Sequence, residues 1–387
     1  MQKTACKSVN PFGFYGEKDR RTDGRQGDRI RGARFARSLI YSLRQIISFC
    51  NRKEIPLFVC YLDASRAFDC VQFQPLLEKM IERGFGWEII NFFFYWFTHQ
   101  KFIIIWNLIF SDPFSVQRGV RQGGILSPYF FAMYIDELSK QLTNSGLGLT
   151  LMGEIINHLI YADDICLLAT SKSSLDLLLK ICDDYATEHG LTFNSKKTQL
   201  QIFFPRWVNI LNPVFSIMFK GCEIEVCTSV RYLGYIIQSD RKWHKDSLSD
   251  EDEIFKRSGE LYKRAYMIRS KFSKCSLSMK KYLFTTYLSS IYCSSLWMLS
   301  RPQYQKIRVS YNNALRIVFG LSRDSSATSM FIDLNIRNFF DLRKVAVRSL
   351  AVRNLHSKNC IIDFVSDSSI HYESELSKLW RNILQTN

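Results

Sequence analysis

The spacing of apolar residues changes along the chain and separates predicted helices from predicted strands. From Phe35 to Lys53 ("FARSLIYSLRQIISFCNRK") apolar residues recur at helical spacing, which predicts a helix. The next run, "PLFVCYLDA" (56–64), is a short apolar run that follows a Pro, which is typical of a buried strand. Residues 16–34 are rich in Arg and Gly and poor in apolar residues, so we expect a loop or disordered segment there.

Helix signals return over 73–98, and strand-like runs occupy 102–109 and 113–118. The most apolar stretch of the chain, residues 87–110, is interrupted by the polar residues 98–101. Neither half is long enough for a transmembrane helix, and we interpret the stretch as a buried helix followed by a strand.

The glycine-rich "RGVRQGG" leads into a predicted helix that begins near Ser127 and Pro128, with Ser as N-cap, and runs to about Leu142. Residues 155–170 predict a hairpin with "YADD" at its turn. A helix over 173–189 should follow and end at Gly190.

The segments "TQLQIFF" and "RYLGYIIQ" are strand-like, and from about residue 250 the pattern is helical and rich in Lys and Arg. The pattern therefore predicts an α+β core over about 55–240, followed by a basic helical region.

Composition narrows the classes of function. The chain has 387 residues, enough for two or three domains, and a net charge of +16, which favours a polyanionic partner such as nucleic acid. The eleven cysteines form no CxxC pair, and Cys222 and Cys227 have no histidine nearby in sequence, so we expect no zinc and free thiols in a reducing, intracellular compartment. No signal peptide opens the chain, and no membrane partner is expected.

Two adjacent aspartates, Asp163 and Asp164, lie inside the apolar run "LIYADDICLL". A plain hairpin turn explains them, because Asp tolerates turn geometry. The alternative is a divalent-metal site, which needs a further carboxylate, and Asp63 at the end of the strand "PLFVCYLDA" is the candidate. If the two strands are neighbours in one sheet, the carboxylates form a cluster that only cations can neutralise.

Five segments in order resemble the reverse transcriptases of non-LTR (LINE-type) retrotransposons. They look like polymerase motifs A to E: "YLDASRAFDCV" (61–71), "GVRQGGILSP" (119–128), "YADD" (161–164), "GLTFNSKKTQL" (190–200) and "VRYLGYII" (230–237). The resemblance implies a right-hand polymerase palm, an antiparallel sheet backed by helices. It implies partial fingers over 1–54, a palm over 55–240 and a mainly helical thumb and C-terminal region over 241–387.

The resemblance also assigns roles to residues. Asp63, Asp163 and Asp164 would be catalytic and would bind two Mg²⁺ ions, with Mn²⁺ as an alternative. Lys197 would protonate or neutralise the leaving pyrophosphate. The alternative is an exposed lysine at a strand edge with no role in the reaction.

Nucleotide and template contacts are implied for Phe68, Gln122, Gly123 and Tyr161. Phe68 falls at the position that excludes a ribose 2′-hydroxyl, and its alternative is an ordinary core aromatic. For Gln122 and Gly123 the alternative is that "RQGG" is only a flexible loop before a capped helix. The resemblance further implies that Tyr232, Leu233 and Gly234 hold the primer end as the primer grip.

The chain departs from the family pattern at its start. We find no match to the family's endonuclease or to its triphosphate-binding arginine, and Tyr15 stands in "NPFGFYGEKDRR" (10–21) where the family has Arg. The resemblance therefore implies a chain truncated at the N-terminus.

The leading hypothesis is an RNA-directed DNA polymerase that uses dNTPs, an RNA template and a DNA primer, and that acts in the nucleus during target-primed integration. The alternative is an inactive retroelement remnant that still binds nucleic acid. An RNA polymerase is disfavoured by "YADD" and Phe68, and the sequence is silent on intron splicing and on protein partners.

Overall fold

The computed structural model describes two compact units. Described residues are 24–64, 66–151, 153–204, 216–239, 249–367 and 373–385. The first unit contains the described residues within 1–34, 53–227 and 358–361, and the second those within 35–52, 228–357 and 362–387. The predicted segment "NPFGFYGEKDRR" lies outside the described residues. The named fingers, palm and thumb ranges stay predictions.

The first unit is built on a five-stranded sheet with the order β13-β10-β1-β9-β8. Its strands are β1 (Leu57–Asp63), β8 (His158–Tyr161), β9 (Asp164–Ala169), β10 (Gln199–Phe203) and β13 (Glu225–Val226). All neighbours are antiparallel except β10 and β13. The predicted strand at 56–64 and the predicted hairpin at 155–170 are confirmed: β1 and β9 are internal strands with almost wholly buried apolar side chains, and β8 pairs with β9 at the edge of the sheet.

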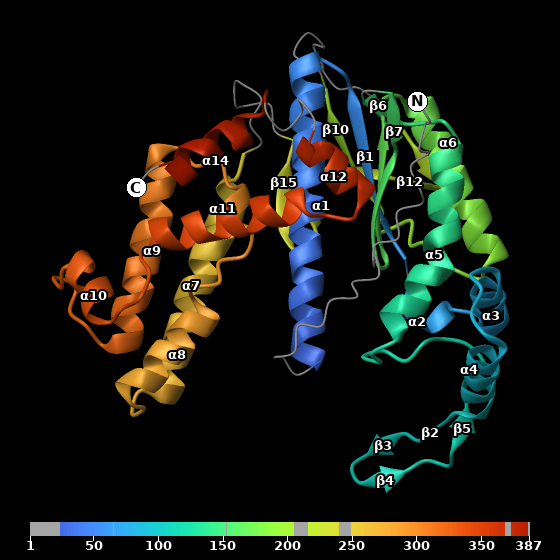
Figure 1. Cartoon of the computed structure of the whole chain (residues 1–387), viewed down its shortest axis with the longest axis horizontal. Helices are drawn as coiled ribbons and strands as arrows, with labels where there is room; N and C mark the ends of the chain where they lie inside the picture. The colour runs from blue at the N-terminus through green and yellow to red at the C-terminus, as the bar shows by residue number, and fades with distance from the viewer. Residues whose placement is uncertain are drawn as a thin grey trace. The chain divides into compact units, whose positions relative to one another are not determined.

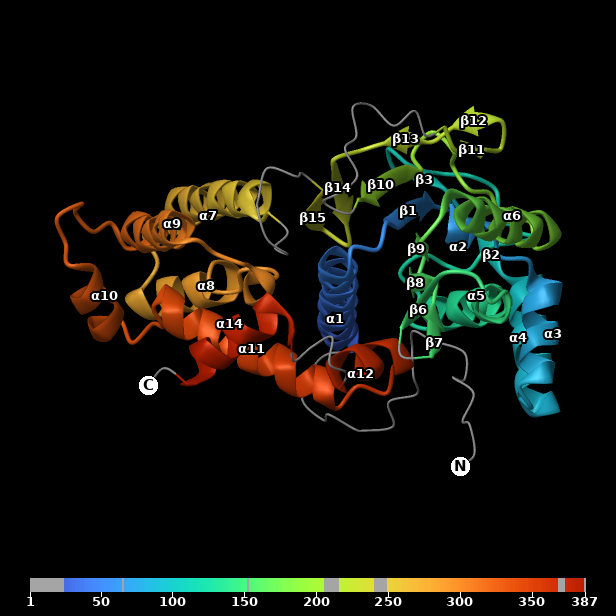
Figure 2. The ribbon, with the colours of Figure 1, turned by 90° about the horizontal axis from the view of Figure 1, so that it is seen from above.

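Two helices, α5 (Ser127–Asn144) and α6 (Lys172–Glu188), pack against this sheet and against each other (Figure 2). Helix α6 begins after Ser171, whose side chain caps the Ser174 amide, and ends before Gly190 at φ 64°, as predicted. Helix α5 begins where expected, but Ser127 is not its N-cap. Its hydroxyl instead donates to the Arg121 carbonyl, and Leu126 takes the N-cap position.

Outside α5 lie α3 (Phe73–Glu82) and α4 (Trp87–His99), which pack on each other, and the short helix α2 (Ala67–Cys70) follows β1. The remaining strands of this unit form small hairpins. These are β2 (Lys101–Phe102) with β5 (Phe114–Ser115), β3 (Ile105–Trp106) with β4 (Ile109–Phe110), β6 (Leu149–Leu151) with β7 (Glu154–Ile156), and β11 (Met218–Phe219) with β12 (Cys222–Glu223).

Residues 87–110 contain the predicted helix, but the prediction that this helix is buried is wrong. Helix α4 exists, but only Ile90 and Phe97 are buried, and Trp87 and Trp96 are 69% and 53% exposed. The hairpins that continue beyond α4 are also exposed (Figure 1). One stripe of α4 meets the core through rings such as Phe93, which lies 5.0 Å from Phe130 between ring centroids. Helix α4 is apolar around most of its circumference, but the core covers only one side of it.

No helix in the described part of the chain is long and apolar enough to cross a membrane. The ten described cysteines are free thiols.

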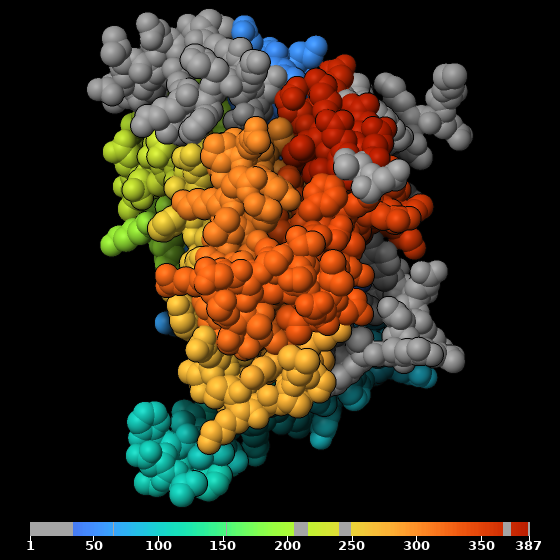
Figure 3. Space-filling model, turned by 90° about the vertical axis from the view of Figure 1, so that its left-hand side faces the viewer, coloured from blue at the N-terminus to red at the C-terminus, as the bar shows by residue number. Residues whose placement is uncertain are grey.

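The second unit is mainly helical. Its elements are the 35–52 part of α1 (Gly24–Lys53), the hairpin β14 (Ser229–Tyr232) and β15 (Tyr235–Gln238), α7 (Glu251–Phe272), α8 (Leu277–Tyr287), the 3-10 turn η1 (Ser294–Leu296), α9 (Arg301–Phe319), α10 (Ala327–Asp333), α11 (Phe339–Leu355), most of α12 (Cys360–Asp367) and α14 (Glu375–Gln385). Helix α7 packs along α9, and α8 contacts both. In Figure 3, α8, α9 and α10 form much of the face of this unit that is turned to the viewer.

Helix α1 corrects the expected loop over 16–34, because it already begins at Gly24. A helix that is nucleated by its buried half can extend through Arg-rich sequence at little cost. From Ala36 to Ile47 nearly every side chain is buried, including polar ones. The polar ones have partners inside the unit: Ser38 donates to Asn354 at 2.7 Å and Arg44 pairs with Asp250 at 2.6 Å.

A buried polar pair fixes the start of the β8–β9 hairpin in the first unit. The Asn157 amide donates to the Leu142 and Leu147 carbonyls at 2.5 and 2.8 Å, and its oxygen lies 2.7 Å from His158 Nδ1. His158 Nε2 lies 2.7 Å from the Ser139 hydroxyl. Since an amide oxygen only accepts, Nδ1 carries the proton, and in the neutral imidazole that burial favours, Nε2 accepts from the Ser139 hydroxyl.

Burial lowers the pKa of His158 from 6.5 to about 4. The unfolded chain therefore binds more protons than the native one between these values, and native stability falls as the pH drops through this window. We expect His158 to remove about 2–3 kcal/mol of stability between pH 7 and pH 4.

Urea unfolding of wild type and His158→Gln at pH 7 and pH 4.5 measures this contribution. The variant should lose less stability on acidification than wild type, whereas His356→Gln at an exposed histidine should behave like wild type. Equal acid sensitivity of wild type and His158→Gln would contradict the assignment.

Candidate active site

The candidate site lies in the first unit, at the end of the sheet where β1 stops and β9 starts. Asp63 and Asp164 are direct partners in the antiparallel β1–β9 ladder. Paired residues of antiparallel strands place their side chains on the same face, with Cβ atoms about 4.5–5.5 Å apart. The predicted neighbourhood of the two strands is therefore confirmed, and the register sets these two carboxylates side by side.

Asp163 belongs to the two-residue turn between β8 and β9. Tyr161 and Asp164 are paired across the turn, which leaves Ala162 and Asp163 at its tip. Ala162 has φ 52°, in the left-handed region that costs an L-residue roughly 1–2 kcal/mol. The turn thus keeps a strained backbone directly beside the carboxylates, which is where proteins tolerate such strain for function.

The carboxylates interact unfavourably with one another. Partial desolvation at the sheet end, followed by the charges of Asp163 and Asp63, raises the pKa of Asp164 to about 6. Desolvation and then the charge of Asp63 also raise the pKa of Asp163. The pKa of Tyr161 is raised by partial burial and then by the charges of Asp164 and Asp163. Three like charges at one sheet end are thus held together by the fold against their repulsion.

Lys197 is the cation nearest Asp63 among the ion pairs of the described chain, with Nζ 3.6 Å from Oδ2. Its segment is tied to the same strand end, because the Asn194 amide donates to the Asp63 carbonyl at 2.9 Å. The Thr198 hydroxyl and amide both donate back to the Asn194 carbonyl. The Lys197 side chain itself is 67% exposed, so the ion pair is weak and the ammonium is free to move toward a ligand.

Phe68 follows β1 in helix α2 and is partly buried. Its ring stacks on Phe131 of α5 with centroids 4.8 Å apart, and its carbonyl accepts from the Val120 amide at 2.8 Å. One face of the Phe68 ring therefore packs in the core, as the alternative interpretation of an ordinary core aromatic expects. A ring held in this way is also rigid, as a residue that excludes a ribose hydroxyl would need to be.

The glycine-rich segment before α5 packs against α2. Gly119 has φ 99°, and a Cβ there would lie 3.0 Å from the Asp69 carbonyl oxygen, so only glycine fits. Gln122 is exposed and donates from Nε2 to both Asp69 carboxylate oxygens at 3.2 and 3.3 Å. Gly123 has φ 79° with open space around the position of a Cβ, which leaves its backbone accessible to a ligand.

The donor set fits a divalent cation in its chemistry. The site offers hard carboxylate oxygens from three aspartates, and desolvation followed by neighbouring negative charge raises the pKa of Asp163 and of Asp164, so a bound cation would stabilise it. Across the described residue ranges, however, no three His, Cys, Asp or Glu side chains are already arranged around a single metal position. Asp63, Asp163 and Asp164 therefore fit as ligands by type and neighbourhood rather than as a preformed cage.

The three predicted primer-grip residues lie in the second unit, at the β14–β15 hairpin. Tyr232 is buried and pairs with Tyr235, and Leu233 and Gly234 form the turn. Both turn residues have positive φ, 47° and 80°, which identifies a type I′ turn. The segment predicted to be strand-like folds into this hairpin, and its role as a primer grip stays a prediction.

Sequence reasoning missed the side chains that hold this turn. The region from about residue 250 is helical and rich in Lys and Arg, as predicted, but Arg257 on α7 is only 8% exposed and pairs with Glu253 at 2.5 Å. Acidic and basic residues alternate at spacings of three and four along α7, from Glu253 to Arg264, and this signal could have indicated a charged network.

Comparison with known proteins agrees with this reading of the motifs. The family model "Reverse transcriptase (RNA-dependent DNA polymerase)" matches residues 27–237. A type-1 retrotransposable element R2 polyprotein of Nasonia vitripennis is 27% identical over 163 residues, which are 42% of this chain and 16% of that protein. The RNA-directed DNA polymerase from mobile element jockey of Drosophila funebris is 22% identical over 297 residues, 74% of this chain and 31% of that protein.

Among solved structures, telomerase from Candida albicans in complex with a fragment of telomeric RNA aligns with 91% of this chain and 54% of its own, at 14% identity and a TM-score of 0.36. The chain thus spans less than a third of the retrotransposon relatives it matches. The relatives confirm the resemblance to non-LTR retrotransposon proteins. With a family match over more than half of its length, the chain belongs to the reverse transcriptase (RNA-dependent DNA polymerase) family.

Proposed function

We propose that this chain extends the 3′ end of a DNA primer on an RNA template, using dNTPs and two divalent cations, as part of a non-LTR retrotransposon. The observation that carries the proposal is the carboxylate cluster. Asp63 and Asp164 are paired across two buried strands, and Asp163 occupies the adjoining turn. A fold gains nothing in stability from three like charges at one place, whereas phosphoryl transfer needs them.

In this proposal Asp63, Asp163 and Asp164 hold two Mg²⁺ ions, with Mn²⁺ as an alternative. Two such ions, when bound, stabilise both the attacking and the leaving oxygen of an in-line phosphoryl transfer. Lys197 moves from Asp63 toward the triphosphate and neutralises charge on the leaving pyrophosphate.

Selection of the nucleotide falls to residues around the cluster. The ring of Phe68, fixed against Phe131, would meet a ribose 2′-hydroxyl and so favours dNTPs. Gln122 and Gly123 offer an exposed amide and an accessible backbone to the templating pair. The net charge of +16 supports binding to a primer–template duplex, and such binding should weaken with salt. Residence in the nucleus also belongs to this proposal.

Asp163→Ala tests the reaction directly. Because this change removes a metal ligand from the proposed centre, we expect Mg²⁺-dependent extension of a DNA primer on an annealed RNA template to fall by roughly 10³-fold or more. The assay follows product length on a denaturing gel, at matched protein and duplex concentrations.

Asp176→Asn is the matched control, since Asp176 is an exposed aspartate on α6 of the same unit and should extend like wild type. Wild-type protein that binds the duplex in a salt-sensitive manner but never extends it would overturn the proposal. That result would favour an inactive binder of nucleic acid.

Asp164→Asn tests the metal site without the reaction. Removing one of three repelling charges should raise the free energy of unfolding at pH 7 in EDTA by about 1 kcal/mol, after allowance for solvent screening. Added Mg²⁺ should stabilise wild type more than the variant, because binding to the native state adds stability in proportion to its affinity.

Thermal unfolding with EDTA and with Mg²⁺ measures both effects, and Asp176→Asn again serves as control. A wild type whose melting temperature does not respond to Mg²⁺ or Mn²⁺ would show that the cluster is no cation site.

A further inference from the structure

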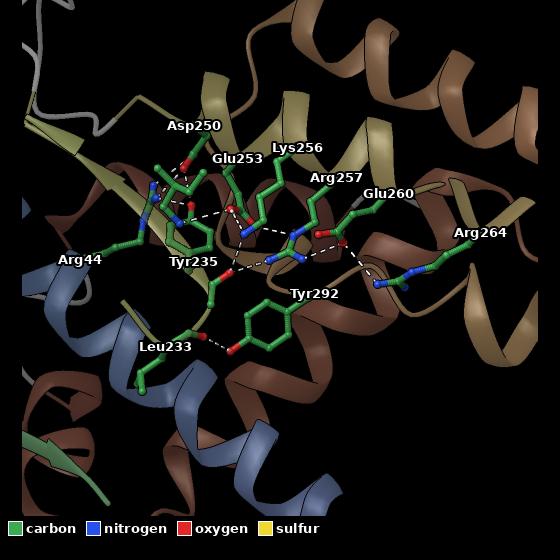
Figure 4. Close-up of polar contacts among 12 residues, drawn as sticks. Arg44, Leu233, Tyr235, Asp250, Glu253, Lys256, Arg257, Glu260, Arg264 and Tyr292 are labelled. Carbon is green, nitrogen blue, oxygen red and sulfur yellow. Dashed lines mark hydrogen bonds and ion pairs between the residues drawn. The ribbon is translucent and has the colours of Figure 1, made fainter. Parts of the chain in front are cut away.

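The turn between β14 and β15 is held through its backbone carbonyls by side chains from elsewhere in the second unit (Figure 4). The Gly234 carbonyl accepts from Arg257 Nη2 at 2.8 Å and from Lys256 Nζ at 3.3 Å. The Leu233 carbonyl accepts from the Tyr292 hydroxyl at 2.9 Å. Both carbonyls of the turn are thus fixed by groups that lie more than twenty residues away in the sequence.

Arg257 is itself held in one orientation. Its Nε donates to Glu253 Oε1 at 2.5 Å and its Nη1 to Glu260 Oε2 at 2.9 Å, and its guanidinium lies 5.1 Å from the centroid of the Tyr292 ring. The Glu253 side chain is fully buried, and its other oxygen accepts from the Ile236 amide on β15 at 3.2 Å. The planar fork of an arginine can serve all these partners at once, whereas the ammonium of a lysine cannot.

We call the hydrogen bonds from Arg257, Lys256 and Tyr292 to the two turn carbonyls the clamp, and the clamp stabilises a strained turn. Leu233 adopts φ 47°, which costs an L-residue roughly 1–2 kcal/mol, so this turn needs support from outside the hairpin. Hydrogen bonds to both turn carbonyls fix the planes of the peptide groups, and with them the direction in which the tip of the hairpin points. The bonds from Arg257 and Lys256 to the Gly234 carbonyl are charge-assisted, and such bonds are about twice as strong as neutral ones.

We infer that Arg257 is a positioning residue that sets the orientation of the Leu233–Gly234 turn, and through it the placement of the primer 3′ end. The inference rests on the proposed function and on the family resemblance, which places the primer grip at this turn. Arg257 does not contact nucleic acid in this scheme, because it is buried and its donors face protein groups. Its loss should therefore affect the rate of the reaction more than the affinity for the duplex.

Arg257→Lys and Arg264→Lys form a matched pair for the test. Both arginines lie on α7 and both donate to Glu260, but Arg264 makes its other hydrogen bond to the Tyr287 carbonyl, away from the turn. Primer extension at saturating duplex should fall about tenfold or more in Arg257→Lys and stay within about twofold of wild type in Arg264→Lys. The duplex Kd, from fluorescence anisotropy, should change by less than about twofold in both.

Tyr292→Phe is a milder second variant, because it removes only the hydroxyl that holds the Leu233 carbonyl and keeps the ring. We expect about a threefold loss of extension rate with an unchanged Kd. Hydrogen exchange, measured on the free protein, should show faster exchange in the peptide that spans 230–238 for Arg257→Lys, and no change there for Arg264→Lys.

Equal extension rates in wild type and Arg257→Lys would overturn the inference. So would a rate loss that is matched by a loss of duplex affinity, or one shared by Arg264→Lys. A wild type that fails to extend overturns the proposed function instead. In that case hydrogen exchange still tests whether Arg257 orients the turn. Equal exchange of the 230–238 peptide in the two lysine variants refutes this role, and faster exchange in Arg257→Lys supports it.

Discussion

The antiparallel pairing of β1 with β9 is the constraint on which the candidate site depends. It sets Asp63 opposite Asp164 and brings the Asp163 turn to the same sheet end. A slip of one residue would turn one carboxylate to the other face of the sheet. The register is secured by the apolar side chains of both strands, which are buried over almost their whole length. Core packing therefore offsets the repulsion among the charges.

Strained or glycine-dependent backbone lies beside several of the candidate functional groups. Ala162 lies in the left-handed region beside the aspartates, and Gly119 approaches Asp69 so closely that a side chain has no room. Leu233 repeats the pattern in the second unit. Such positions persist only where neighbouring structure fixes them, and here the neighbours are buried strands, helix α2 and the charged network of α7.

Charges have different uses in the two units. In the first unit three carboxylates share one sheet end, where the exposed Lys197 lies near Asp63. In the second, Arg44 with Asp250 and Arg257 with Glu253 are buried and paired. Buried pairs of this kind contribute little net stability, but they are sensitive to geometry and so specify one arrangement. The first arrangement suits the binding of cations, and the second suits the positioning of a hairpin.

The sequence alone determined the main strands of the sheet, the hairpin at 155–170 and most of the helices, because each depends on local spacing of apolar residues and on turn chemistry such as Gly190. It also indicated Asp63, Asp163 and Asp164 as one cluster, since strand ends of one sheet meet. Tertiary structure alone decided that α4 exposes most of its aromatic residues and that Arg257 points inward to a carbonyl. Apolar spacing shows which face can be buried, but whether a surface covers it, and which distant carbonyl a long side chain reaches, depends on chain segments that meet only in the folded protein.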